Sequence, residues 1–390
     1  MKRGIASSET GVNAVLPGNG SFAYTLSPDK SEAPMGNEAF ARKWNFGPPE
    51  TALLKGVAVC MLLCHHLFFT PSDGYDDWFV AGYPFWHSLA IVCKSTVALF
   101  LLLSGFGLYR SSQRNPLNTF EFYKKRLLRL YPTYFLVWLI FVPLTLIFTD
   151  HSLAAAFGDY ISLKLIANLL GIQMYFGMYG YNPTWWFMTA ILTMYAFFPA
   201  FYRLAGTRWG LEILAVAAAA IDIFDVWFIN AIIRQQSFAF IWGMLLAKHY
   251  WIEKSTQWPR IPLLMACATV CLIVSWIRLG FENPGHPFCG DTFLATALII
   301  LIWSTIPYGS CTFRFFALLG NHSYSIFLFH IFIIGFLLHN LVYATKNPLF
   351  ILFSSLCLCL PIALILDKFE KILVQQCQKL LHMSSIRAVL

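Results

Sequence analysis

The run from Thr51 to Thr70, TALLKGVAVCMLLCHHLFFT, constrains the fold of this chain more than any other stretch. It is as long and as apolar as a helix that crosses a lipid bilayer, which takes about 20 residues. The run nevertheless carries Lys55 near one end and His65 and His66 near the other. Ionisable side chains are costly inside a membrane and by default mark a functional path. The run therefore predicts a first membrane helix that also carries function.

The spacing of Lys55 and His66 places both side chains on one face of such a helix. At roughly 100° per residue, the eleven steps between them amount to about three turns and roughly 16 Å. His65 lies roughly 80° off that face, so we expect it to pack against or orient its neighbour. A core histidine bonded to a backbone carbonyl is the alternative for His66, and the membrane setting favours a functional imidazole. The alternative for Lys55 is a lysine that extends to the interface.

Composition extends this prediction to the whole chain. Hydrophobic residues make up 58% of the 390 residues and charged residues only 12%, which is more apolar surface than a soluble core absorbs. The fold class is therefore an all-α polytopic membrane protein, and we count about ten transmembrane helices of near-bilayer length. The net charge of +8 does not indicate nucleic-acid binding, because basic residues collect in the cytoplasmic loops of such proteins.

We predict three regions along the chain. Residues 1–48 are polar, lack the apolar segment of a signal peptide and suit a flexible cytoplasmic tail. Residues 49–370 form the transmembrane domain, and residues 371–390 form a cytoplasmic C-terminal tail. Basic residues gather in alternate loops, which predicts that both termini are cytoplasmic. The predicted spans cover about residues 51–70, 88–109, 130–148, 186–202, 211–230, 234–250, 261–278, 291–307, 323–343 and 348–367.

The connector Phe122–Pro132, FYKKRLLRLYP, is the second candidate site. Arg126 and Arg129 are three positions apart and share a helical face. One interpretation is an anchor on anionic lipid. The other is a phosphate clamp, because guanidinium groups present a planar fork to phosphate oxygens and lysines such as Lys125 and Lys55 present a point charge. On the second interpretation these cations hold a polyanionic nucleotide cofactor at the cytoplasmic mouth of the helix bundle.

A third group of residues, expected on the opposite side of the membrane, combines acids, aromatic rings and an amide. Sugars bind by stacking their C–H faces on rings while their hydroxyls bond to carboxylates and amides. For Trp185 and Trp186 the alternative is the aromatic belt of a membrane interface. The candidates for carbohydrate binding are Asp73, Asp76, Asp77, Trp78, Asn182, Trp185 and Trp186.

Five short sequence motifs, called phrases below, follow one another along the chain. They are Lys55 with His66, LFLLLSGF at residues 99–106, Phe122 with Lys125, Arg126, Arg129 and Pro132, the stretch Trp186–Ala190 with Tyr195 and Pro199, and SYSIFLFH at residues 323–330. In this order they resemble the acyltransferase family three membrane proteins, which O-acylate surface polysaccharides and related acceptors. The chain departs from the family where Lys55 and Lys125 replace the commoner arginine. Ile191 also stands where some members carry a glutamate.

The resemblance implies an integral membrane O-acyltransferase of a bacterial inner or plasma membrane. The donor would be cytoplasmic acyl-CoA, usually acetyl-CoA, and the acceptor a hydroxyl of a surface polysaccharide or lipid-linked saccharide. Membrane lipid and that saccharide are the expected partners, and neither a metal nor nucleic acid is expected. The residues assigned to CoA binding are Lys55, Lys125, Arg126 and Arg129.

His66 is the predicted catalytic residue. Its neutral imidazole could deprotonate an acceptor hydroxyl as a general base, or take the acyl group itself as a nucleophile. The last phrase adds Ser323, Tyr324 and His330 to the predicted substrate contacts. Two other classes of protein remain open. One is a secondary transporter or flippase for a sugar or lipid-linked intermediate, with a proton relay through Lys55 and His66, and the other is a membrane scaffold. Dependence of product formation on acyl-CoA separates the enzyme from the transporter.

Overall fold

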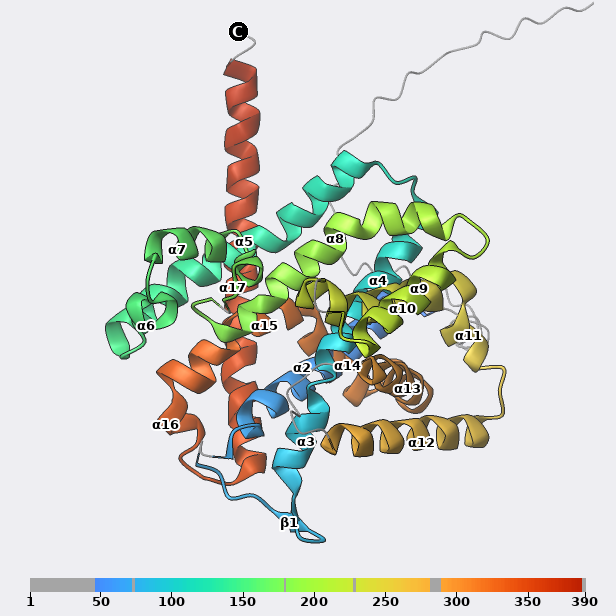
Figure 1. Cartoon of the computed structure of the whole chain (residues 1–390). Helices are drawn as coiled ribbons and strands as arrows, with labels where there is room; N and C mark the ends of the chain where they lie inside the picture. The colour runs from blue at the N-terminus through green and yellow to red at the C-terminus, as the bar shows by residue number, and fades with distance from the viewer. Residues whose placement is uncertain (1–45, 72–73, 179, 227–228, 281–288, 388–390) are drawn as a thin grey trace, which may run out of the picture. The chain divides into compact units, whose positions relative to one another are not determined.

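The computed structural model describes residues 46–71, 74–178, 180–226, 229–280 and 289–387, with residues 377–387 described by their backbone alone. Asp73 and most of the predicted N-terminal tail lie outside the described residues. The elements, labelled in Figure 1 where there is room, are α2 (Pro48–Phe68), β1 (Phe79–Val80), β2 (Tyr83–Pro84), α3 (Phe85–Cys93), α4 (Thr96–Arg114), α5 (Thr119–Phe148), α6 (Leu153–Phe157), α7 (Ile161–Leu169), η2 (Gln173–Phe176), η3 (Pro183–Trp185), α8 (Trp186–Ala205), α9 (Gly210–Ile223), α10 (Ala231–His249), α11 (Trp251–Ser255), α12 (Arg260–Leu279), α13 (Gly290–Thr305), α14 (Cys311–Asn321), α15 (Ser323–Ile331), the π-helical η4 (Phe332–Leu337), α16 (His339–Val342) and α17 (Pro348–Arg387).

The all-α polytopic class is confirmed, but the count of about ten spans is not. Within the described ranges, six helices are long and apolar enough to cross a membrane, and a seventh results if the bent pair α14 and α15–η4 counts as one span. α9 and α13 have 14 and 16 residues, so they reach roughly 21–24 Å against a hydrocarbon core of about 30 Å. α17 continues through the predicted C-terminal tail as far as Arg387.

The first predicted span corresponds to α2, and residues at its N-terminus explain where the helix begins. Pro48 and Pro49 occupy the first turn, where the missing N–H groups would have no partner within the helix. The backbone N–H of Gly47 donates to the carboxylate of Glu50 at 2.9 Å, which closes the N-terminus. α2 ends at Phe68, so both histidines lie in its last turn.

The basic connector is not a loop, and this corrects the predicted span 130–148. α5 begins at Thr119, and the Asn118 side chain accepts a hydrogen bond from the backbone N–H of Glu121 at 3.2 Å. Lysine and arginine favour helix, so the helix runs through the basic phrase. Pro132, predicted at a helix start, lies inside the helix. Arg126 and Arg129 are thereby fixed on a rigid element.

Glycines set the closest approaches between helices. A Cβ added at Gly105 of α4 would overlap the carbonyl oxygen of Phe240 in α10, and one at Gly243 of α10 would lie 2.8 Å from the carbonyl carbon of Leu102. Helices in membranes pack closely where small residues let their backbones meet. Gly105, in the Ser104–Phe106 end of LFLLLSGF (called the SGF phrase below), thus lets α4 pack closely against α10.

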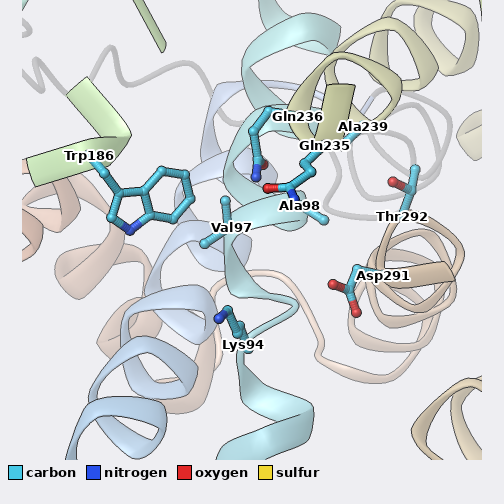
Figure 2. A pocket seen from close by; sticks show the side chains of 9 residues that line it. All are labelled: Lys94, Val97, Ala98, Trp186, Gln235, Gln236, Ala239, Asp291 and Thr292. Carbon is cyan, nitrogen blue, oxygen red and sulfur yellow. The ribbon is translucent and has the colours of Figure 1, made fainter. Parts of the chain in front are cut away.

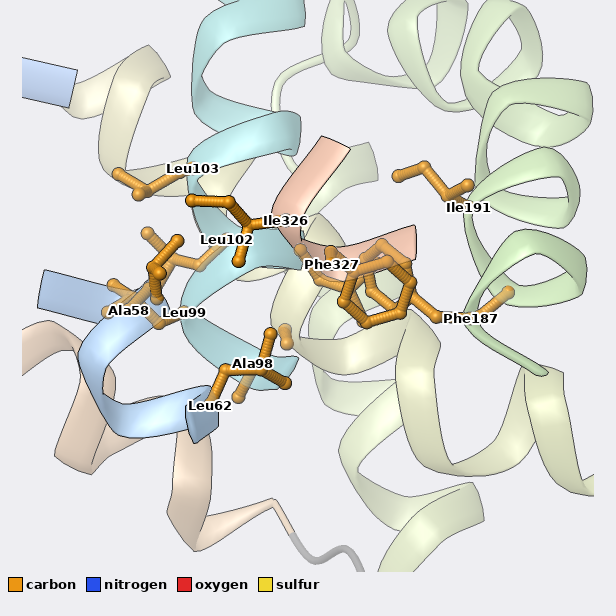
Figure 3. Packing of buried hydrophobic residues seen from close by; sticks show 14 of the residues in the cluster. Ala58, Leu62, Ala98, Leu99, Leu102, Leu103, Phe187, Ile191, Ile326 and Phe327 are labelled. Carbon is orange, nitrogen blue, oxygen red and sulfur yellow. The ribbon is translucent and has the colours of Figure 1, made fainter. Parts of the chain in front are cut away.

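The core around these contacts is shared by helices that are distant in sequence. Figure 3 shows Ala58 and Leu62 of α2 beside Leu99 and Leu102 of α4. Side chains from α8 and α15 pack on the same cluster, among them Ile191, which is 4% exposed. Ile191 is therefore a packing position.

Two helix breaks border this core. α3 ends at Cys93 and α4 begins at Thr96, which leaves Lys94 between them. α14 and the following helix are bent by 64° at their junction, and α15 passes into the π-helical η4 at Phe332. Irregular backbone of this kind inside a membrane occurs where it is buried in protein or lines a cavity.

Candidate functional site

Three histidines lie together where the end of α2 meets α15. The ring centroids of His66 and His330 are 5.0 Å apart, and those of His65 and His66 are 4.8 Å apart. His330 is 0% exposed, whereas His66 is partly exposed. The structure therefore brings the predicted catalytic residue together with a predicted substrate residue from the last phrase.

His65 points to a different neighbour. Its Nδ1 lies 2.8 Å from the carbonyl oxygen of Ala90 in α3, and the side chain is buried. A carbonyl oxygen only accepts, so Nδ1 carries the proton in this contact. The bond attaches the end of α2 to α3, which is a packing and orienting arrangement for His65.

One of the two ring nitrogens of His330 is bonded within its own helix and the other is not. Its Nδ1 lies 2.9 Å from the carbonyl oxygen of Phe327 and 3.1 Å from that of Ile326, so this nitrogen donates within its own helix. Nε2 is buried and has no hydrogen-bond partner among the described residues. In a neutral imidazole with a proton on Nδ1, Nε2 is an acceptor. His330 can therefore accept a proton or a hydrogen bond from its neighbour His66.

The predicted donor-binding cations gather around the other end of α2. The Lys55 ammonium is within electrostatic reach of the guanidinium groups of Arg129 and Arg126 on α5. Lys55 and Arg126 are partly buried, while Arg129 and Lys125 are exposed. No carboxylate in the described ranges lies at salt-bridge distance from Lys55, Arg126 or Arg129. Cations that repel one another at close range favour a polyanionic ligand.

Three of the sequence phrases meet at Arg126. Its guanidinium lies 5.9 Å from the centroid of the Tyr195 ring and 5.6 Å from that of Phe122. The hydroxyl of Tyr195 lies 3.3 Å from the Oγ of Ser104. The second, third and fourth phrases thus supply one connected cluster on α4, α5 and α8. Arg126 Nε is buried without a partner among the described residues, so a donor remains available there.

The last phrase fastens α15 to α5. The Tyr324 hydroxyl donates to the carbonyl oxygen of Leu130 at 2.9 Å, one residue beyond Arg129. Ser323 is the first residue of α15 and is buried. The Tyr324 bond ties α15 to the part of α5 that carries Arg129.

The acidic loop before α3 has a local structural role at one position. Both carboxylate oxygens of Asp77 accept backbone N–H groups, from Trp86 at 2.8 Å and from His87 at 3.0 Å. This contact satisfies free N–H groups in the first turn of α3. Asp76 and Trp78 are exposed and remain open to a ligand.

The amide and tryptophans before α8 are divided between two environments. Asn182 and Trp185 are 0% exposed, and both donate to the carbonyl oxygen of Leu328, at 3.2 and 2.9 Å. They hold this loop against α15. Trp186 is partly exposed and faces a small pocket beside α4. Of the three, Trp186 is the one placed to touch a ligand.

Three charged residues inside apolar segments were not assigned from the sequence. Arg278 is 0% exposed and donates to both carboxylate oxygens of Asp291 at 2.9 Å. Its Nε donates to the carbonyl oxygen of Ile91 at 2.9 Å. Lys94 stands at the break between α3 and α4. The signal was available, because each is an ionisable residue within or beside a predicted span, as Lys55 is.

Comparison with known proteins identifies the family of the chain. The family model of the acyltransferase domain matches residues 52–368. That range runs from α2 into α17 and includes each of the site residues described above. No curated protein and no solved structure matches the chain.

Proposed function

This chain belongs to acyltransferase family 3, and we propose that it moves an acyl group from acyl-CoA to a hydroxyl of a carbohydrate or lipid-linked sugar across the membrane. Acetyl-CoA is the proposed donor. The observation that carries the proposal is the layout of α2, with Lys55 among the cations near its start and His66 beside His330 near its end.

The donor binds by its phosphates in this proposal. Lys55, Arg126 and Arg129 surround the nucleotide end of CoA, where guanidinium forks and an ammonium suit phosphate oxygens. The flexible pantetheine arm then extends along α2 and carries the thioester toward His66, roughly 16 Å away along the helix axis. The cations bind and orient the donor but lie too far from the thioester to exchange protons with it.

His66 acts on the acceptor hydroxyl as a general base. One ring nitrogen takes the hydroxyl proton while the oxygen attacks the thioester carbonyl carbon. The C–S bond breaks, the ester forms, and the proton passes from His66 to the departing CoA thiolate. A nucleophilic role for the same nitrogen, with an acyl-imidazole intermediate, uses the same residues.

His330 is the positioning partner of His66. Its Nε2 has no hydrogen-bond partner among the described residues, and in the proposed ground state it accepts the N–H of the His66 ring. That contact leaves the second His66 nitrogen unprotonated and turned to the acceptor, as the orienting group of a catalytic dyad or triad does. It also stabilises the imidazolium that forms when the hydroxyl proton moves.

The experiment compares surface glycans and lipids by mass spectrometry in cells that carry the wild-type protein, His66→Ala, or no copy of the protein. We expect esters of one acyl mass on a saccharide with wild type only. Their presence at equal abundance in all three strains would refute acyl transfer by this chain. A saccharide that changes location without any change in mass would favour the transporter or flippase instead.

A further inference from the structure

A small polar pocket lies inside the bundle between α4, α8, α10 and α13. Figure 2 shows Gln235 and Gln236 of α10 at one end, Lys94 at the other, and Trp186 to one side. Val97, Ala98 and Ala239 form its apolar wall, and Asp291 and Thr292 complete it.

Two side chains in this pocket lack partners for their polar groups. The Lys94 ammonium makes neither a hydrogen bond nor an ion pair with any residue in the described ranges. Gln236 is 3% exposed, and its amide also has no hydrogen bond to a described residue. Buried polar groups are normally paired, and an unpaired charge inside a membrane is costly. Both groups therefore call for a ligand that accepts hydrogen bonds.

The charge of the pocket indicates the sign of that ligand. Asp291 is the acid that faces Lys94, but its two oxygens already accept from Arg278. Lys94 is thus left without a carboxylate of its own among the described residues, and the nearby histidines add no negative charge. A ligand group with a single negative charge balances the Lys94 ammonium. A dianionic phosphate would carry more charge than Lys94 neutralises and would be repelled by Asp291.

The pocket lies close to the histidine cluster. Lys94 is one helical turn beyond Ala90, whose carbonyl oxygen contacts the His65 ring. Ala98 in the pocket wall packs near Leu62, which is one turn before His66 on α2 (Figure 3). Lys94 is also within electrostatic reach of His66. A ligand group held by Lys94 therefore belongs to a molecule that can reach His66.

We infer that this pocket seats the carboxylate of an acidic acceptor, a hydroxy acid or uronic-acid sugar, whose hydroxyl lies at His66. The inference rests on the proposed acyl transfer for the role of the bound molecule. The Lys94 ammonium and the Gln236 amide donate to the carboxylate, while the exposed face of Trp186 lies against the ring that carries it. The room in the pocket is small, which suits a carboxylate and leaves the rest of the acceptor on the His66 side.

Binding to the purified full-length protein in lipid nanodiscs tests this inference without any acyl transfer. Isothermal titration compares methyl glucuronoside with the neutral methyl glucoside. We expect the glucuronoside to bind at least about tenfold more tightly, since its carboxylate meets a half-buried cation that has no partner among the described residues. Lys94→Met should remove that preference and leave glucoside binding unchanged. Lys254→Met, at an exposed lysine of α11, is the matched control and should preserve the preference.

The results separate this inference from the proposed function. Equal affinity of wild type for the two glycosides, or a preference that survives in both Lys94→Met and Gln236→Leu, would overturn the acidic acceptor. Acyl transfer to a neutral sugar with a lower kcat in Lys94→Met would also overturn it, because Lys94 would then act on the reacting oxygen. A Lys94-dependent preference in a protein that transfers no acyl group would support the pocket and refute the enzyme.

Discussion

Replacing Gly105 by alanine should weaken the contact between α4 and α10. The added Cβ would overlap the carbonyl oxygen of Phe240 and lie 3.0 Å from its carbonyl carbon. Backbone atoms cannot rotate away as a side chain can, so we expect the upper end of the overpacking range, about 3 kcal/mol. Alanine has a higher helix propensity than glycine, which raises the free energy of unfolding by about 1 kcal/mol. The net loss in the free energy of unfolding is therefore about 2 kcal/mol.

Gly107 provides the matched control on the same helix. It is exposed, and a Cβ there meets no atom within 4 Å. Gly107→Ala should therefore be neutral or stabilise by up to about 1 kcal/mol. Both free energies are measured by reversible denaturant unfolding in detergent micelles. If Gly105→Ala proves as stable as Gly107→Ala, the close approach of α4 and α10 is wrong, and with it the placement of the SGF phrase.

Three further results are expected. His66→Ala should lower kcat by about 100-fold to 10,000-fold, which is the usual contribution of a general base. His65→Ala should keep most activity and lower the free energy of unfolding by about 1–3 kcal/mol, because the Ala90 carbonyl loses its hydrogen bond. Equal losses of kcat in the two variants would refute the separate roles. Lys55→Ala and Arg126→Ala should mainly raise KM for acyl-CoA, and donor-concentration curves with an unchanged KM in both would exclude the phosphate clamp. A cysteine placed at position 113, in a chain without other cysteines, should react with a membrane-impermeant maleimide only when the reagent has access to the cytoplasmic side. Labelling of intact cells from outside would refute the predicted topology.

The elements that the sequence predicts best are those in which one physical requirement dominates. α2 follows from bilayer length, although the predicted span begins at Thr51 and the helix begins at Pro48. The spacing of Lys55 and His66 follows from helix geometry alone, and the structure keeps the two at opposite ends of one rigid element. The other predicted spans with long apolar windows are found as helices for the same reason.

The elements that the sequence misses depend on tertiary contacts. The start of α5 lies outside the predicted span 130–148 because it is too charged for a membrane span, although lysine and arginine are strong helix formers. The breaks at Lys94 and after Asn321 carry no turn signal as strong as proline. The backbone N–H groups of Lys94, Ser95 and His322 bond to carbonyls three residues earlier in the same segment. The pairing of His330 with His66 joins residues far apart in the chain, and no periodicity within either segment indicates it.

The acyl group itself provides the most direct measurement. Purified wild-type protein in proteoliposomes receives acetyl-CoA labelled in its acetyl group on one side and a saccharide extract of the cell envelope on the other. We expect label to appear in alkali-labile esters of the saccharide with wild type, and to be absent with folded His66→Ala. Equal labelling by the two proteins, or no labelling by wild type in the presence of its own envelope extract, would contradict acyl transfer from CoA through His66.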